Sequence, residues 1–131
     1  MREIMPSAEQ TIHTYAAAIT ALDTDAFVAC FAPNCELNDP VGAPPSYGQD
    51  GARAFFTGFL PLLDSIEFRP VAIFAASGSA AYSWVVEATG KAGQSARAEG
   101  IDVFEFDANG KILRSFGYWD PGPFVAALTA A

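Results

Sequence analysis

The spacing of the apolar residues changes once along this chain of 131 residues, close to residue 65. Before that point they recur every three or four positions, as in amphipathic helices, and after it they alternate, as in half-buried strands. Helices gathered first and strands afterwards predict an α+β fold. Its simplest form is one domain over residues 1–131, in which three N-terminal helices pack in a curved, mainly antiparallel sheet that makes a cone with an apolar mouth.

The first part of the chain predicts three helices. Ser7 opens a capping box, and the helical spacing after it places Tyr15 on a buried stripe. A second, short helix is expected over residues 24–31, and Asp50 is expected to cap the third. The third helix has a wide apolar stripe made of Phe55, Phe56, Phe59, Leu60 and Leu63.

Between the second and third helices, residues 35–39 alternate and predict a strand with Asp39 on the same face as Leu37. Residues 40–48 contain three prolines and two glycines and predict a loop. Later strands are expected over residues 66–69, 71–75, 80–88, 96–106 and 111–119, with a hairpin turn at residues 107–110.

The strand around Asp102 is apolar on both faces. Its even-numbered positions from Ala98 to Phe106 share one face with Asp102, and Ile101 and Val103 lie on the other. One face can cover the helices, whereas the other would be bare in a monomer. We therefore expect a homodimer formed through the sheet.

Composition excludes several classes of function. The net charge of −8 and the pI near 4.3 would repel nucleic acid and anionic lipid headgroups. The sequence shows neither a secretory signal nor a continuous apolar segment of membrane-spanning length, so a cytoplasmic protein without membrane insertion is expected. Cys30 and Cys35 are predicted to be packing residues. No cluster has metal-ligand spacing and no glycine-rich phosphate loop is present, so neither a metal nor a cofactor is expected.

Three polar residues fall where the apolar pattern predicts an interior: Tyr15, Asp39 and Asp102. A buried, unpaired carboxyl tends to stay neutral and can then donate a hydrogen bond. With a buried phenol it would form a pair of donors suited to an oxyanion. The pattern alone leaves structural roles open, since Asp102 could bond a backbone group or an arginine, and an aspartate before proline often starts a turn.

These residues together resemble the ketosteroid isomerases of the nuclear-transport-factor-2-like superfamily. Residues 35–48 are similar to the family's Asp-Pro-x-Gly-x-Pro-Pro-x-x-Gly segment, which carries its general base. Ile101-Asp102-Val103 is similar to the strand with the family's acidic oxyanion donor, and Tyr15 to its tyrosine donor. With Gly117-Tyr118-Trp119, order and spacing agree from about residue 7 to residue 120.

The resemblance implies a cofactor-free enzyme that moves a carbon–carbon double bond of a 3-oxo-Δ5-steroid into conjugation. Asp39 would transfer the proton, and Tyr15 and a protonated Asp102 would hold the oxygen of the dienolate. The expected partner is therefore a small apolar substrate. The side chains expected to form the apolar walls of its pocket are Phe56, Trp84, Phe116 and Trp119.

The sequence departs from the best-known bacterial relatives at three positions. Phe31 and Phe56 stand where those relatives carry tyrosines that support the oxyanion tyrosine, so a shortened hydrogen-bond network is expected. Trp84 stands where they often carry phenylalanine, which can change how a steroid lies in the pocket.

Other functions on the same fold remain open. Polyketide cyclases of the superfamily also place one aspartate in an apolar pocket, and a non-catalytic module could bind an apolar ligand. Dehydratases use a histidine pair, whereas this chain has only His13. Epoxide hydrolases use an Asp-Arg-Asp set with the arginine two residues from an aspartate, whereas Gly100 precedes Asp102 at that distance.

Overall fold

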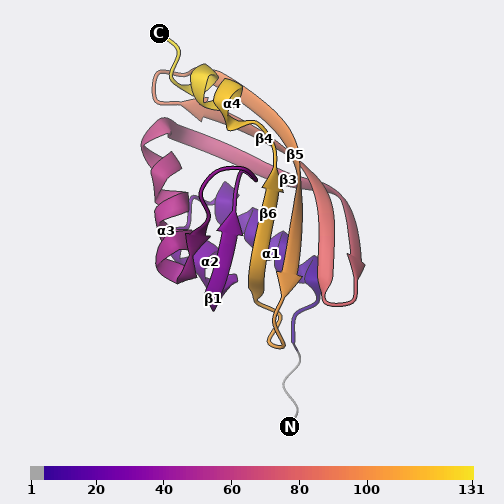
Figure 1. The fold of residues 1–131 in the computed structure, drawn as a ribbon. Coiled ribbons are helices and arrows are strands. Elements are labelled where there is room, and N and C mark those ends of the chain that lie inside the picture. Colours follow the sequence, from indigo (N-terminus) through magenta and orange to yellow (C-terminus); the bar gives the residue numbers. More distant parts are fainter. Residues whose placement is uncertain (1–4) are drawn as a thin grey trace.

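A six-stranded sheet curves around the N-terminal helices in the computed structural model, which describes residues 5–131 (Figure 1). The strand order is β2-β1-β6-β5-β4-β3, and only the β1–β6 pair is parallel. The expected α+β class with a curved, mainly antiparallel sheet is confirmed. The strands are β1 (Phe31–Asn38), β2 (Ser46–Tyr47), β3 (Leu63–Ala76), β4 (Ser79–Gly90), β5 (Ser95–Phe106) and β6 (Ile112–Tyr118).

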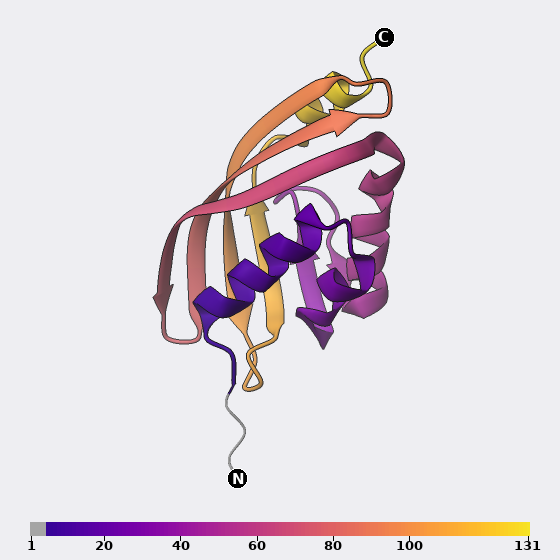
Figure 2. The same cartoon turned by 180° about the vertical axis from the view of Figure 1, so that it is seen from behind.

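The helices lie along the concave side of this sheet. Figure 2, which views the molecule from behind, shows the first helix crossing in front of the sheet, with the second and third helices beside it. The sheet is curved and not closed, and its concave side faces these helices. The helices are α1 (Ala8–Thr20), α2 (Thr24–Ala29), α3 (Gly48–Phe59) and α4 (Pro121–Leu128), with a 3₁₀ turn η1 (Leu60–Leu62) after α3.

Helix α1 begins as its sequence predicts. The Ser7 side chain accepts from the Gln10 backbone N–H, and the Gln10 side chain accepts from the Ser7 N–H, which completes the capping box. The helix buries Ile12, Tyr15 and Ala16 on one stripe. The predicted hairpin between β5 and β6 is also confirmed, with Gly110 at a positive φ of 77°.

Several expected boundaries were wrong. Helix α2 ends at Ala29 and not at residue 31, and α3 ends at Phe59, so Leu60 and Leu63 lie outside it. Helix α3 begins at Gly48 behind Tyr47, which makes no side-chain cap, and Asp50 lies inside its first turn. Strand β1 begins at Phe31 and not at residue 35, because a shift of register between Phe31 and Glu36 accommodates Pro33 in its pairing with β6.

Strand β3 is continuous where the sequence predicts two strands. Pro70 lies inside it, beside a shift of register between Pro70 and Ala72. A proline is tolerated there because β3 is the edge strand, so the missing N–H interrupts no second ladder. The sequence also gave no expectation for α4, which Asp120 caps by accepting from the Gly122 N–H.

Candidate functional site

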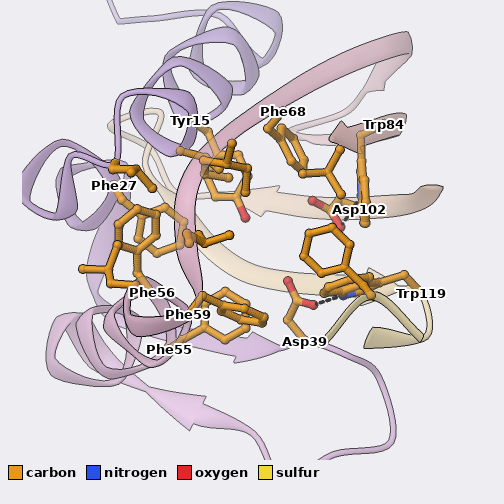
Figure 3. A pocket seen from close by; sticks show the side chains of 17 residues that line it. Tyr15, Phe27, Asp39, Phe55, Phe56, Phe59, Phe68, Trp84, Asp102 and Trp119 are labelled. Atoms are coloured by element: carbon orange, nitrogen blue, oxygen red, sulfur yellow. Dashed lines mark hydrogen bonds between the residues drawn. The ribbon is translucent and has the colours of Figure 1, made fainter. Parts of the chain in front are cut away.

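The concave side of the sheet encloses one apolar cavity with a small polar set (Figure 3). The empty volume is about 610 Å³, which includes open solvent at the mouth of the cavity. Tyr15, Asp39 and Asp102 line it, and every other lining side chain is aliphatic or aromatic. The cavity therefore offers a phenol and two carboxyls to a ligand that is otherwise apolar.

Tyr15 reaches the cavity from the buried stripe of α1. It is 3% exposed, and its ring packs among Phe27, Phe31 and Phe104 at centroid distances of 5.2, 6.2 and 5.1 Å. Its hydroxyl points into the cavity (Figure 3). Burial raises the pKa of Tyr15 well above its ordinary value, so the phenol stays protonated and can donate a hydrogen bond.

Asp39 follows the last residue of β1 and is held against β6. The Val41 N–H donates to the Gly117 carbonyl over 2.8 Å, which ties the start of the loop to β6. The indole Nε1 of Trp119 donates to Asp39 Oδ1 over 2.7 Å. Among residues 5–131, Trp119 is the one side chain that donates to this carboxyl, and the other carboxyl oxygen is available to a ligand (Figure 3).

Gly117 makes room for the Asp39 carboxyl. A Cβ at residue 117 would lie 2.5 to 2.8 Å from the carboxyl atoms of Asp39, closer than any real contact. Gly117 is also the direct cross-strand partner of Asp102 on β5. The absence of a side chain at this one position therefore brings the two carboxyls to neighbouring places on the same face of the sheet.

We expect Gly117→Ala to misplace Asp39 while the chain still folds. A displacement of about 1 Å in a reacting group can lower a rate by about 10²-fold, and a loss of that size is expected in any reaction that uses Asp39. Gly58→Ala on α3 is the matched control, because a Cβ there meets no atom within 4 Å. Turnover of both variants and their circular dichroism spectra test this. Wild-type turnover in Gly117→Ala would contradict the role assigned to this glycine.

Asp102 lies on β5 and is 2% exposed. Both of its oxygens are hydrogen-bonded to side chains of the neighbouring strand β4. The Tyr82 hydroxyl donates to Oδ2 over 2.6 Å, and Trp84 Nε1 donates to Oδ1 over 3.0 Å. The alternative that Asp102 pairs with an arginine is wrong, because its partners are a phenol and an indole.

Both carboxyls keep their protons to a higher pH than a free aspartate does. Burial raises the pKa of Asp39 from 3.8 to about 6, although the Trp119 hydrogen bond opposes this. Burial, and next the nearby charge of Asp39, raise the pKa of Asp102 to about 7, although the bonds from Tyr82 and Trp84 oppose this. Because one ionised carboxyl disfavours ionisation of the other, the two carboxyls titrate as a pair, and the site favours a state in which only one of them is ionised between the two pKa values.

In residues 5–131, no group of three or more His, Cys, Asp or Glu side chains is arranged to hold a metal ion. Within the same residues, no helix combines the length and the apolar character needed to cross a membrane.

Comparison with known proteins places this fold and cavity in a family. Residues 12–115 match the SnoaL-like domain family. The chain belongs to this family. A relative of this SnoaL-like chain, the steroid Delta-isomerase of Nocardioides simplex, is 34% identical over 111 residues, which cover 85% of this chain and 88% of that protein.

A solved structure supports the same fold. The SnoaL-like chain superposes with a TM-score of 0.78 on the epoxide hydrolase/cyclase-like enzyme SalBIII, described for its role in pyran ring formation in the polyether salinomycin. The match covers 88% of this chain and 92% of the other, at 22% identity. At that identity the likeness establishes the fold and leaves the activity to be argued from the cavity.

The SnoaL-like fold brings most of the predicted site residues together. Tyr15, Asp39 and Asp102 line one cavity, and three of the four expected wall residues line it as well: Phe56, Trp84 and Trp119. The expectation for Phe116 was wrong. On β6 the inward positions are Ser115 and Gly117, which are buried, so Phe116 between them points to the other face of the sheet.

Sequence reasoning missed the polar roles of Tyr82 and of both tryptophans. Tyr82 does not line the cavity, yet it is the direct cross-strand partner of Asp102. Residues 82 and 102 pair because the turn lies between Gly90 and Ser95, and the alternation within each strand does not fix that register. Trp84 and Trp119 were expected only as apolar walls, but each donates its indole N–H to a carboxyl.

Proposed function

We propose that this SnoaL-like chain is a steroid Delta-isomerase that converts a β,γ-unsaturated 3-ketosteroid into the conjugated α,β-unsaturated ketone, without a cofactor. The observation that carries the proposal is a cavity in which two carboxyls and one phenol lie among walls that are otherwise apolar. The 34% identity to the steroid Delta-isomerase of Nocardioides simplex supports it.

In the first step, ionised Asp39 removes a proton from the carbon between the carbonyl and the alkene. The electrons of the broken C–H bond move through the carbonyl group and leave a dienolate with negative charge on its oxygen. The Tyr15 hydroxyl and protonated Asp102 donate hydrogen bonds to that oxygen. Such donors act strongly in this cavity because its walls are almost entirely apolar.

In the second step, Asp39 returns the proton to the far carbon of the conjugated system. The double bond then lies beside the carbonyl, and Asp39 is ionised again. One carboxylate can make both transfers because the dienolate remains bound between them. The hydrogen bond from Trp119 keeps Asp39 oriented while it changes charge.

The walls of the cavity fit a flat apolar body. Phe56, Trp84 and Trp119 line it together with further rings from α3 and β3. Trp84 and Trp119 meet edge to face at a centroid distance of 5.3 Å. Burial of the apolar rings of a steroid against such walls supplies binding energy, and the polar set fixes the position of the ketone.

The direct test is the ultraviolet absorbance of the conjugated enone when wild-type protein is mixed with a β,γ-unsaturated 3-ketosteroid. We expect a rise that is proportional to protein concentration. Protein heated until it unfolds is the control for background isomerisation. If folded wild-type protein gives no rise above that background, the isomerase proposal is wrong.

A cyclase that uses the same cavity is the alternative function if that test shows no isomerase activity. Its support is the fold shared with SalBIII and an aspartate placed beside an apolar space. The Asp-Arg-Asp set of epoxide hydrolases finds no support, because the cavity-lining residues within the described part of the chain include no arginine.

The isomerase proposal predicts a bell-shaped dependence of kcat/KM on pH. Asp39 must be ionised to act as the base, so activity rises with pH through about 6. Asp102 must be protonated to act as a donor, so activity falls with pH through about 7. Initial rates from about pH 4 to about pH 9 test this. Activity that continued to rise up to about pH 9 would contradict a protonated Asp102 as donor.

We also propose that the chain forms a homodimer through the outer face of its sheet. Ile101 and Tyr118 are cross-strand partners on that face and are 49% and 52% exposed. Exposed apolar side chains on adjacent strands of a sheet are a common basis for pairing.

A further inference from the structure

Polar support in the cavity is distributed unevenly between the two proposed oxyanion donors. The Tyr15 ring lies among phenyl rings, and no side-chain hydrogen bond between residues 5 and 131 involves its hydroxyl. Asp102, in contrast, has a side-chain partner on each carboxyl oxygen. Both partners come from β4. Their hydrogen bonds lower the pKa of Asp102, so they do not serve to keep it protonated, and their role needs another explanation.

The register of the sheet places these partners. Tyr82 lies directly opposite Asp102, and Trp84 lies directly opposite Gly100. A Cβ on residue 100 would come within 2.4 Å of the Trp84 indole. Because Gly100 has no side chain, the indole can cross β5 at this point and reach the carboxyl two residues along the strand.

The three groups form a network with defined donors and acceptors. An indole N–H can only donate, so Asp102 Oδ1 acts as an acceptor whether or not the acid is ionised. A phenol can donate or accept, so Tyr82 can remain bonded to Oδ2 in both protonation states. Rotation of the carboxyl about its own axis would break both bonds, and Tyr82 and Trp84 are themselves 1% and 4% exposed and held by packing.

We propose that Tyr82 and Trp84 are positioning residues that fix the plane of the Asp102 carboxyl toward the oxygen of the bound ketone. When protonated Asp102 donates a hydrogen bond to that oxygen, the Tyr82 hydroxyl donates one to Asp102, and the two hydrogen bonds reinforce each other. The inference rests on the proposed isomerase function for the role of Asp102, whereas the network itself exists in the ligand-free protein.

Tyr82→Phe is the decisive variant because Tyr82 does not line the cavity and its ring is retained. We expect kcat to fall roughly 10- to 100-fold while KM changes by less than about twofold, since the apolar walls stay intact. Trp84→Phe should lower kcat as well, but it also changes a wall and so raises KM. Tyr47→Phe is the matched control, because Tyr47 is 64% exposed and distant from Asp102 in the fold.

A second readout does not depend on catalysis. Carbon-13 spectra of protein labelled at the aspartate carboxyls follow the titration of Asp102, whose signal is identified by its absence in Asp102→Asn. Both hydrogen bonds favour the ionised form, so the midpoint should move to higher pH in Tyr82→Phe and in Trp84→Phe and stay in place in Tyr47→Phe. A purely packing role for Tyr82 would leave the midpoint unchanged.

The outcomes separate this inference from the function on which it rests. An unchanged midpoint together with wild-type kcat in Tyr82→Phe would overturn the positioning role, even if the wild-type protein is an isomerase. If the midpoint shifts in Tyr82→Phe but the wild-type protein has no isomerase activity, the proposed function is overturned. The network then supports Asp102 in a site for a different ligand.

Discussion

Asp39→Asn is expected to lower kcat for the isomerisation by about 10⁴-fold, the largest effect of any single substitution in this chain. General acid–base catalysis contributes about 10²- to 10⁴-fold in enzymes. The upper end applies here because one carboxylate is proposed to make both proton transfers. An amide has the shape of the carboxyl but almost no basicity, so the chemical step loses its base.

The fold and the binding of the substrate should survive this substitution. The amide oxygen of asparagine can still accept from Trp119 Nε1, which donates to Asp39 in the wild-type protein. A steroid with a phenolic A ring, which mimics the enolate, should therefore bind the variant about as well as wild type. Enone absorbance measures kcat, and fluorescence titration with the phenolic steroid measures affinity.

Asp64→Asn is the control for the same chemical change elsewhere. Asp64 lies exposed on β3, outside the cavity. It should keep wild-type turnover. If Asp39→Asn turned over the ketosteroid like wild type, Asp39 would not be the base, and the assignment of both proton transfers would fail.

The local pattern of the sequence was sufficient to predict most elements and an interior position for Tyr15, Asp39 and Asp102, whereas their meeting in one site was implied by the family resemblance. Capping chemistry at Ser7 and the helical stripe placed Tyr15, and alternation in β5 placed Asp102 on the inner face. These predictions succeeded because each depends on residues close together in the chain. The edge position of β3 depends on distant pairing, so Pro70 led to two predicted strands where there is one.

The partners of the polar residues could not be predicted in the same way. Tyr82 and Asp102 are cross-strand neighbours only in one register of the β4–β5 hairpin, and the alternation within each strand is compatible with several. The role of Gly117 depends on the approach of Asp39 from another strand. Phe116 was misassigned because pairing with β5 decides which alternating residues of β6 face inward, and the apolar residues of β6 alone do not show it.

Loss of the oxyanion donors is the second large effect. Tyr15→Phe and Asp102→Asn each alter one group proposed to bind the dienolate oxygen. Removal of one such donor lowers kcat by about 10²- to 10³-fold in enzymes, and Tyr15→Phe should fall in that range. Asp102→Asn should lose less, because an amide N–H can still donate toward the cavity.

Asp102→Leu removes the hydrogen-bond donor at residue 102 and leaves an apolar side chain in its place. It removes every hydrogen bond of residue 102 and should lose about 10²- to 10³-fold in kcat. It also leaves the buried Tyr82 hydroxyl and Trp84 N–H without their partner, which costs about 1 to 3 kcal/mol of stability for each. Urea denaturation therefore measures the stability of this variant, and its kcat is calculated for the folded fraction of the protein.

The double variant Tyr15→Phe/Asp102→Leu tests whether the two groups share one oxygen. Donors to a single atom are coupled, so the loss in kcat should differ from the product of the two single losses, and this double-mutant cycle measures the difference. Affinity for the phenolic steroid should fall in parallel with kcat, since the ligand mimics the charge that both groups stabilise. Losses that multiply without coupling, or a phenolic steroid that binds all variants equally, would place Tyr15 and Asp102 on different parts of the ligand and contradict a common oxyanion site.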